Sequence, residues 1–387
     1  MTKTNKFLFI YGLIMFFAMS LGAFTQITIL GASMSIYWID IFAITLLVLI
    51  LLLPNIFTNK FSTSENLLAL GLVIILVYSM FISFFSDEQL TSLQGSLVIF
   101  LGIIYLICSV VLNNNNKYFF RWAVRIFVSS IAIQLIINML PIFMSAGLSF
   151  YLAKENATTF VGNSNAISFY FVFLVLYELI SRHKFWSFFV VIGIIGVVFS
   201  MSRAGFLSLF ICLSIFVVIS IINKSSNNIK TYFYMIIAIV LLYFAIQNTA
   251  IGKQFLFHLG FGLKATSMHA RDVLGEEAWS KFLQHPFGSG LVWIGDPHNI
   301  IIRSFRDLGF IVGPIFIMIL FFPIFFFFSR KIRDYSNEMI AILVAYCSLL
   351  VHSLFEIFFL TNISLFFTIF SLVYLVKNKS YQYLNDK

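Results

Sequence analysis

The sequence predicts an all-α polytopic membrane protein with about twelve transmembrane helices and one long extracytoplasmic loop that contains short amphipathic helices. Of its 387 residues, 61% are hydrophobic and only 10% are charged, whereas soluble domains carry roughly a quarter charged residues. The mean hydropathy is +1.01. The apolar runs are continuous and about 20 residues long, as membrane-spanning helices require, and lack the ~10-residue alternation of a membrane β-barrel.

Apolar runs expected to cross the membrane lie near residues 6–24, 36–53, 66–85, 93–112, 119–140, 164–181, 185–200, 204–222, 231–250, 300–328, 338–354 and 357–376. The first run follows Lys3 and Lys6 and has no clear small-residue cleavage site, so we expect an uncleaved first helix. Residues 1–387 are expected to form a single membrane domain, with residues 251–299 as the long loop between the ninth and tenth spans.

The basic residues indicate how the chain is oriented. With the N-terminus inside, most of the 24 Lys and Arg residues lie in short clusters on the cytoplasmic side. The remainder belong mainly to the long loop and the start of the following helix: Lys253, Lys264, Arg271, Lys281, Arg303 and Arg306. A Lys/Arg excess in short loops marks the cytoplasmic side, so both termini are expected inside and the long loop outside. The net charge of +9 therefore reflects topology, and we expect no nucleic-acid partner.

No ATP-binding loop, metal-ligand spacing or dinucleotide fingerprint is visible in the sequence, so we expect no cofactor and no metal. The three cysteines lie inside apolar runs and are interpreted as small core residues. An enzyme on the outer face has no access to nucleotides. Its substrate would have to arrive already energised, as a lipid-linked sugar does.

An expected outward hairpin between the seventh and eighth spans contains Ser202, Arg203, Ala204 and Gly205. Arg203 either extends to lipid headgroups or contacts an anion, because a planar guanidinium matches phosphate oxygens.

Within the long loop, Leu274, Ala278 and Phe282 recur every fourth residue. This spacing predicts a short amphipathic helix on the membrane surface, with Trp279 at the interface and Arg271 at its start. Arg271 either forms a salt bridge along this helix or binds an anion at the helix start. The position four residues on is glycine, which leaves Asp272 and Glu276 as poorer partners.

His298 and Asn299 follow Asp296-Pro297, where the tenth span is expected to begin at the outer surface. A histidine there is either a cap or surface residue, or a group that accepts a proton near neutral pH.

Further along the tenth span, Arg303 and Asp307 are four residues apart and are expected to pair along one helix face. Gly309 and Gly313 have the G-x-x-x-G spacing that usually means close helix packing.

Taken in order, these residues resemble the motifs of the bacterial O-antigen ligase and polymerase family. The Ser202–Gly205 hairpin is similar to the family's Ser-Arg-Gly-like motif. It is followed by an arginine, a helix with an aromatic residue and a His-Pro-hydrophobic-Gly-x-Gly turn, and then by His-Asn with a downstream acidic-x-Gly. The corresponding residues are Arg271, Trp279, His285, Pro286, Gly288, Gly290, His298, Asn299, Asp307 and Gly309.

Upstream, residues 160–165 look like the family's Gly-x-x-Asn turn before the sixth span. The family commonly spaces the two glycines after the acidic residue as G-x-x-G, whereas Gly309 and Gly313 are one residue further apart. The motifs cover about residues 158–313, and the rest matches only in hydropathy and span count.

The resemblance implies a metal-independent inverting glycosyltransferase of the bacterial plasma membrane that acts in surface-polysaccharide assembly. Its donor would be an undecaprenyl-pyrophosphate-linked glycan, and its acceptor another glycan or lipid A-core. A polysaccharide chain-length regulator is a further candidate partner, and membrane lipids surround the protein. His298 would accept the proton of the attacking hydroxyl, and Arg203, Arg271 and Arg303 would hold the pyrophosphate. Asn299, Asp307, Gly288 and Gly290 would support the site.

Within that family, polymerase and ligase share their chemistry and differ in acceptor. We slightly favour the polymerase because polymerases are the more diverse members of the family and this chain matches loosely outside the motifs. A lipid-linked oligosaccharide flippase or transporter is the main alternative from another class, although such proteins carry mid-membrane charges, internal repeats and broken helices. Asp40, Glu178 and Glu356 are the visible acids of the spans, and each lies near a span end. A structural scaffold would need neither His298 nor the arginines.

Overall fold

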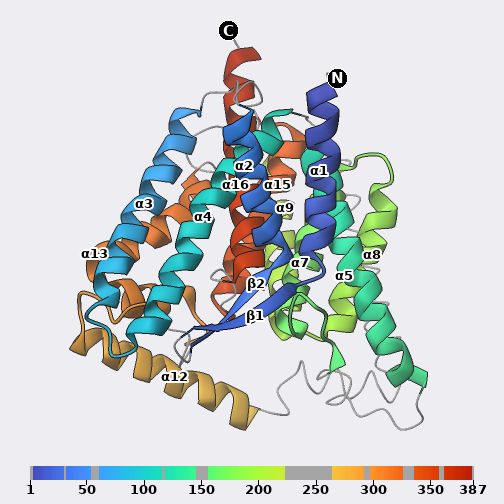
Figure 1. Cartoon of the computed structure of the whole chain (residues 1–387). Helices are drawn as coiled ribbons and strands as arrows, with labels where there is room; N and C mark the ends of the chain where they lie inside the picture. Colours follow the sequence, from blue (N-terminus) through green and yellow to red (C-terminus); the bar gives the residue numbers. More distant parts are fainter. Residues whose placement is uncertain are drawn as a thin grey trace. The chain divides into compact units, whose positions relative to one another are not determined.

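The computed structural model describes residues 3–29, 32–53, 61–115, 118–144, 156–222, 264–291, 297–325, 335–356 and 361–385, and it is about 81% helical. Figure 1 shows the helices coloured along the sequence. Among the described residues, six helices are long and apolar enough to cross a membrane. Every expected span except the ninth coincides with a helix. The ninth, residues 231–250, lies outside the described residues, so the count of twelve stays a prediction.

The described chain divides into two compact units, each built from separate stretches of sequence. The first contains residues 1–130, 271–325 and 353–387, and the second contains residues 131–270 and 326–352. The expectation of a single membrane domain stays a prediction.

The first unit is made of helices that follow the expected spans and one small sheet. Its elements are α1 (Lys3–Met19), β1 (Ala23–Ile29), β2 (Ala32–Tyr37), α2 (Trp38–Leu52), α3 (Thr63–Ser83), α4 (Gln89–Asn115), the start of α5 (Phe119–Met144), most of α12 (Lys264–Gln284), α13 (Ile300–Phe321), the short η2 (Phe322–Ile324) and α16 (Asn362–Asn385). Phenylalanines fill the contact between its first and last helices, where the rings of Phe16 and Phe370 lie 4.7 Å apart.

The first span ends earlier than the sequence predicted. Helix α1 stops at Met19, and the chain then forms the antiparallel hairpin of β1 and β2, in which Ile27 lies opposite Met34. Polar and apolar residues alternate in this stretch, as they do in a half-exposed strand, so the expected span 6–24 was too long at its C-terminal end.

A buried polar cluster fixes one end of α2 to α16. Asp40 accepts hydrogen bonds from the Tyr37 backbone N–H and from the Asn362 side chain, both at 2.8 Å, and from the Tyr105 hydroxyl of α4. A carboxylate that is buried in an apolar bundle needs such donors. The cluster therefore holds three helices together.

The second unit contains the rest of α5, α7 (Ser164–Ser181), α8 (Trp186–Ser200), α9 (Arg203–Ile222) and most of α15 (Asn337–Ser353). Helix α7 is almost entirely buried and forms its centre. Glycines on its neighbours allow close approach. A Cβ on Gly196 of α8 would meet the Phe171 ring at 2.2 Å, and one on Gly205 of α9 would meet the Cβ of Ser168 at 2.8 Å.

Candidate functional site

A groove of about 740 Å³ lies between α12, the start of α13 and the residues after α15, all within the first unit. Charged, aromatic and apolar side chains share its walls. Its lining residues are Arg271, Asp272, Gly275, Glu276, Trp279, Ser280, Leu283, Pro297, His298, Asn299, Ile302, Leu354 and Phe355. Two residues that the sequence singled out from distant motifs, Arg271 and His298, therefore line one cavity.

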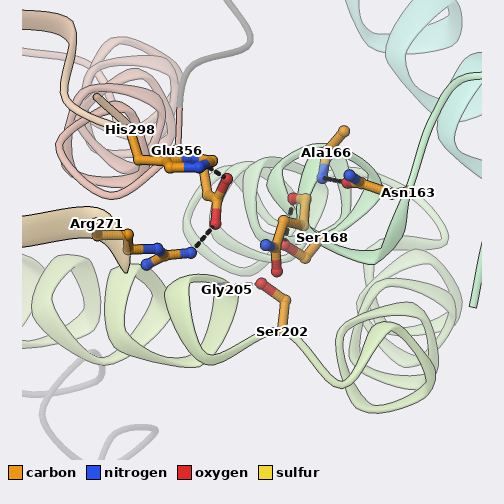
Figure 2. Close-up of polar contacts among 9 residues, drawn as sticks. Asn163, Ala166, Ser168, Ser202, Gly205, Arg271, His298 and Glu356 are labelled. Carbon is orange, nitrogen blue, oxygen red and sulfur yellow. Dashed lines mark hydrogen bonds and ion pairs between the residues drawn. The ribbon is translucent and has the colours of Figure 1, made fainter. Parts of the chain in front are cut away.

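A carboxylate joins those two residues. Glu356 accepts a charge-assisted hydrogen bond from Nη2 of Arg271 through one oxygen, and its other oxygen lies 3.2 Å from Nδ1 of His298 (Figure 2). The side chain of Glu356 is 13% exposed, whereas those of Arg271 and His298 are 36% and 33% exposed. The carboxylate is thus at the back of the site, and the two basic groups are in front of it.

This geometry gives His298 a defined orientation. A carboxylate at Nδ1 holds the imidazole in the tautomer that carries its proton on Nδ1, which makes Nε2 the proton acceptor. The same carboxylate stabilises the imidazolium that forms when Nε2 takes up a proton. The arrangement has the chemistry of a general base that is oriented by a carboxylate.

The backbone around His298 is also unusual. His298 has φ +50°, in the left-handed region that residues other than glycine seldom occupy. Strained backbone of this kind tends to occur at functional sites.

His298 precedes α13 and does not begin it, since Asn299 is the N-cap and accepts from the N–H groups of Ile301 and Ile302 at 2.9 and 3.2 Å. The preceding Asp296 lies outside the described residues.

Helix α12 confirms the helix expected from Arg271 to Phe282 and extends it to Lys264–Gln284. Ala278 is buried, and the Phe282 ring packs edge-on against Phe305 of α13, with 5.6 Å between ring centroids. The partner of Arg271 is Glu356, 85 residues away, and not Asp272 or Glu276 of its own helix. Among the described residues, Nε and Nη1 of Arg271 make no hydrogen bond.

Helix α13 is broken at Gly309, which has φ +70° and ψ −174°. The turn that follows α12 fits into this break: the N–H groups of Ser289 and Gly290 donate to the carbonyls of Arg306 and Asp307 at 2.9 and 3.1 Å, and the Phe310 N–H donates to the Pro286 carbonyl at 3.0 Å. The Arg306 and Asp307 carbonyls and the Phe310 N–H, which lie beside the break, thereby have partners, as buried backbone requires.

The glycines of both motifs serve this junction. Gly288 and Gly290 have φ +107° and +92°, and a Cβ on Gly288 would lie 2.6 Å from the Asp307 carbonyl. A Cβ on Gly309 would lie 2.3 Å from the Phe287 backbone. The interpretation of Gly309 and Gly313 as a packing motif between two spans needs correction. Gly309 breaks its helix, and Gly313 approaches the Ser304 carbonyl of the preceding half of the same helix.

A second charged cluster lies inside the first half of α13. Asp307 accepts from Nε of Arg303 at 3.1 Å and from Nε of Arg306 at 2.6 Å, and all three side chains are at most 3% exposed. The predicted Arg303–Asp307 pair is confirmed. Arg303 faces a small internal cavity and does not line the groove. Its burial argues against the expected contact with pyrophosphate and favours a positioning role.

The Ser202–Gly205 motif belongs to the second unit and forms the start of α9. The Ser202 hydroxyl accepts from the Gly205 N–H at 3.2 Å, while Gly205 allows α9 to approach Ser168 of α7 (Figure 2). The Asn163 side chain caps α7 by accepting from the Ala166 N–H at 3.1 Å. Arg203 is half-buried at the first turn of α9, and its assignment to the pyrophosphate stays a prediction.

From the sequence, Glu356 is an acid near a span end, and it was not predicted to belong to the site. It follows α15 and is 58 residues from His298, so no local spacing connects the two. An acid beside an apolar run, at the same end as the predicted histidine, is the signal that could have identified it.

The fold and the groove define a helical protein of the membrane-spanning type with a supported histidine–arginine site. No protein-family model matches the chain, and no curated protein matches it. Within the described part of the chain, no group of three or more His, Cys, Asp or Glu residues is placed to hold a metal ion.

Proposed function

We propose that this protein transfers a glycan from an undecaprenyl-pyrophosphate carrier to a sugar hydroxyl on the outer face of the bacterial plasma membrane, in surface-polysaccharide assembly. The observation that carries the proposal is the Arg271–Glu356–His298 cluster on the wall of a large groove. It offers a proton acceptor and a guanidinium at one place, and both are needed to activate a hydroxyl and release a diphosphate.

The reaction is a single displacement at the anomeric carbon. The acceptor hydroxyl oxygen forms a bond to that carbon as its proton passes to Nε2 of His298. The bond between the anomeric carbon and the pyrophosphate oxygen breaks on the opposite face, which inverts the configuration. Glu356 stabilises the imidazolium. The leaving undecaprenyl pyrophosphate takes the bonding electrons, and Arg271 neutralises the charge that develops on it.

Arg271 suits this task because Glu356 occupies only one of its terminal nitrogens. A guanidinium presents five N–H donors in a fixed plane, so it can bind a carboxylate on one edge and phosphate oxygens on another. The exposed fraction of its side chain, 36%, leaves it accessible from the groove.

The membrane setting follows from loop charge. The Lys/Arg distribution supports a topology with both termini in the cytoplasm and the groove on the outer side. A lipid-linked donor is consistent with that side. We favour the polymerase reaction, in which one lipid-linked repeat is joined to another. Transfer to lipid A-core by a ligase is the alternative within the same chemistry.

A flippase for lipid-linked oligosaccharides is a second candidate, because α13 is broken at Gly309 and carries three buried charged residues beside the break. Broken helices and buried charges are typical of transporters. The groove favours the enzyme, since a histidine oriented by a carboxylate lies there beside a guanidinium, and the pair suits activation of a hydroxyl and release of a diphosphate.

Purified protein in liposomes with a lipid-linked glycan distinguishes the candidates. We expect glycan transfer that is lost in His298→Ala and retained in His183→Ala, a partly exposed histidine that does not line the groove. Movement of the lipid between leaflets without transfer would support the flippase. Neither activity, in protein that is folded and correctly inserted, would support a scaffold.

A further inference from the structure

Beyond Arg271, the face of α12 that lines the groove changes in chemistry. Asp272, Glu276 and Trp279 all line the groove and are exposed, and their spacing of four and three residues places them on one side of the helix. Trp279 is 48% exposed. Two carboxylates and an indole thus follow the guanidinium along the same wall.

Gly275 makes space between them. A Cβ built on Gly275 meets nothing within 4 Å, although the residue lines the groove. Glycine costs a helix about 1 kcal/mol relative to alanine. Close packing does not explain the glycine here, because no neighbouring atom would clash with a Cβ. Its structural consequence is open volume between the two carboxylates and the indole.

These three side chains suit a ligand different from the one that suits Arg271. Carboxylates accept hydrogen bonds from hydroxyl groups and repel phosphates. An exposed indole offers a flat apolar face beside a polar N–H. A pyranose has the complementary surface, with hydroxyl donors around its edge and an apolar C–H face.

We propose that Asp272, Glu276 and Trp279 form the subsite that binds the acceptor as a hydroxyl-rich carbohydrate, an inference that rests on the proposed glycan transfer. Arg271 holds the diphosphate, His298 takes the proton of the acceptor hydroxyl, and the acceptor ring lies along α12. The lining residues from Arg271 to Leu283 span roughly 18 Å of helix, enough for a diphosphate and a sugar ring together.

The test uses purified full-length protein and, as a probe, the oligosaccharide released by mild acid from the lipid-linked glycan of the host cells. Binding is measured by saturation-transfer NMR, and transfer kinetics are measured separately for donor and acceptor. We expect Glu276→Gln and Trp279→Leu to raise the probe Kd and the acceptor KM about tenfold and to leave the donor KM unchanged. Trp279→Tyr should restore most of the binding.

Two control variants distinguish loss of probe binding at the subsite from misfolding of the protein. Glu277→Gln changes the neighbouring exposed carboxylate, which does not line the groove, and should bind as wild type does. Gly275→Trp should fill the open volume and abolish probe binding, whereas Glu277→Trp places the same bulk outside the groove and should not.

The outcomes distinguish this inference from the function on which it rests. Wild-type transfer together with unchanged binding and kinetics in Glu276→Gln, Trp279→Leu and Gly275→Trp would overturn the subsite and leave the proposed function standing. Probe binding that depends on these residues without any transfer would support the subsite and overturn the transfer reaction. A wild-type protein that neither binds the probe nor transfers glycan would overturn both.

Discussion

Two charged clusters in the first unit share a plan, with one carboxylate between two basic side chains. In the groove, Glu356 contacts Arg271 and His298, whose side chains are about one-third exposed. Inside α13, Asp307 contacts Arg303 and Arg306, and all three are at most 3% exposed. The difference in access separates their roles. The groove cluster is accessible to a substrate, whereas the internal cluster is buried in the half of α13 that precedes the break at Gly309.

The internal cluster should produce the larger loss of stability. Asp307→Ala removes the carboxylate that both buried guanidiniums bind, and breaking a buried ion pair costs about 3–5 kcal/mol. We expect a lower melting temperature and less folded protein in detergent, measured by fluorescence-detected size-exclusion chromatography. Asp272→Ala, an exposed acid of α12, is the matched control and should fold as wild type does. Normal stability of Asp307→Ala would contradict a structural role for the internal cluster.

The groove cluster should show the opposite pattern. His298→Ala is expected to lower the rate of glycan transfer at least 100-fold, because general-base catalysis contributes about 10²–10⁴-fold. The amount of folded protein should not change, since the His298 side chain is partly exposed. The measurement is the transfer rate per folded molecule. Full activity at normal abundance would remove His298 from the mechanism.

Arg271→Lys should have an intermediate effect. An ammonium can contact Glu356 but cannot also present a second planar edge to phosphate oxygens. We expect about a tenfold fall in kcat/KM for the lipid-linked donor, determined by steady-state kinetics over a range of donor concentrations. Wild-type turnover in Arg271→Lys would favour a purely structural salt bridge.

The smallest effect is expected at the helix start that carries His298. Asn299→Ala removes the N-cap of α13 and should cost about 1 kcal/mol, whereas Asn299→Asp keeps a capping oxygen and should cost less. Thermal melts of the two variants measure this difference. Equal melting temperatures would show that the cap does not stabilise α13.

The sequence predicted the features that depend on local pattern. Continuous apolar runs predicted the helices, and apolar residues repeated every four positions predicted α12. The four-residue separation of Arg303 and Asp307 predicted their ion pair. It could not predict Glu356 as the link between Arg271 and His298, because that contact joins residues far apart in the chain.

The break in α13 was missed for a different reason. Gly309 and Gly313 have the spacing of a helix-packing motif, and only the fit of the Pro286–Gly290 turn against Arg306 and Asp307 shows that the helix is interrupted. The β1–β2 hairpin was missed because the adjacent apolar run was extended into an alternating segment that forms a strand.

The central claim is that His298 and Glu356 act as one catalytic unit, and a double-mutant cycle tests it most directly. Transfer rates are measured for wild type, Glu356→Gln, His298→Ala and the double variant, each normalised to folded protein. If Glu356 acts through His298, Glu356→Gln lowers the transfer rate when it is the only substitution. It then causes no further loss in the His298→Ala variant. Effects that multiply in the double variant would show that the two residues act independently and would contradict the claim.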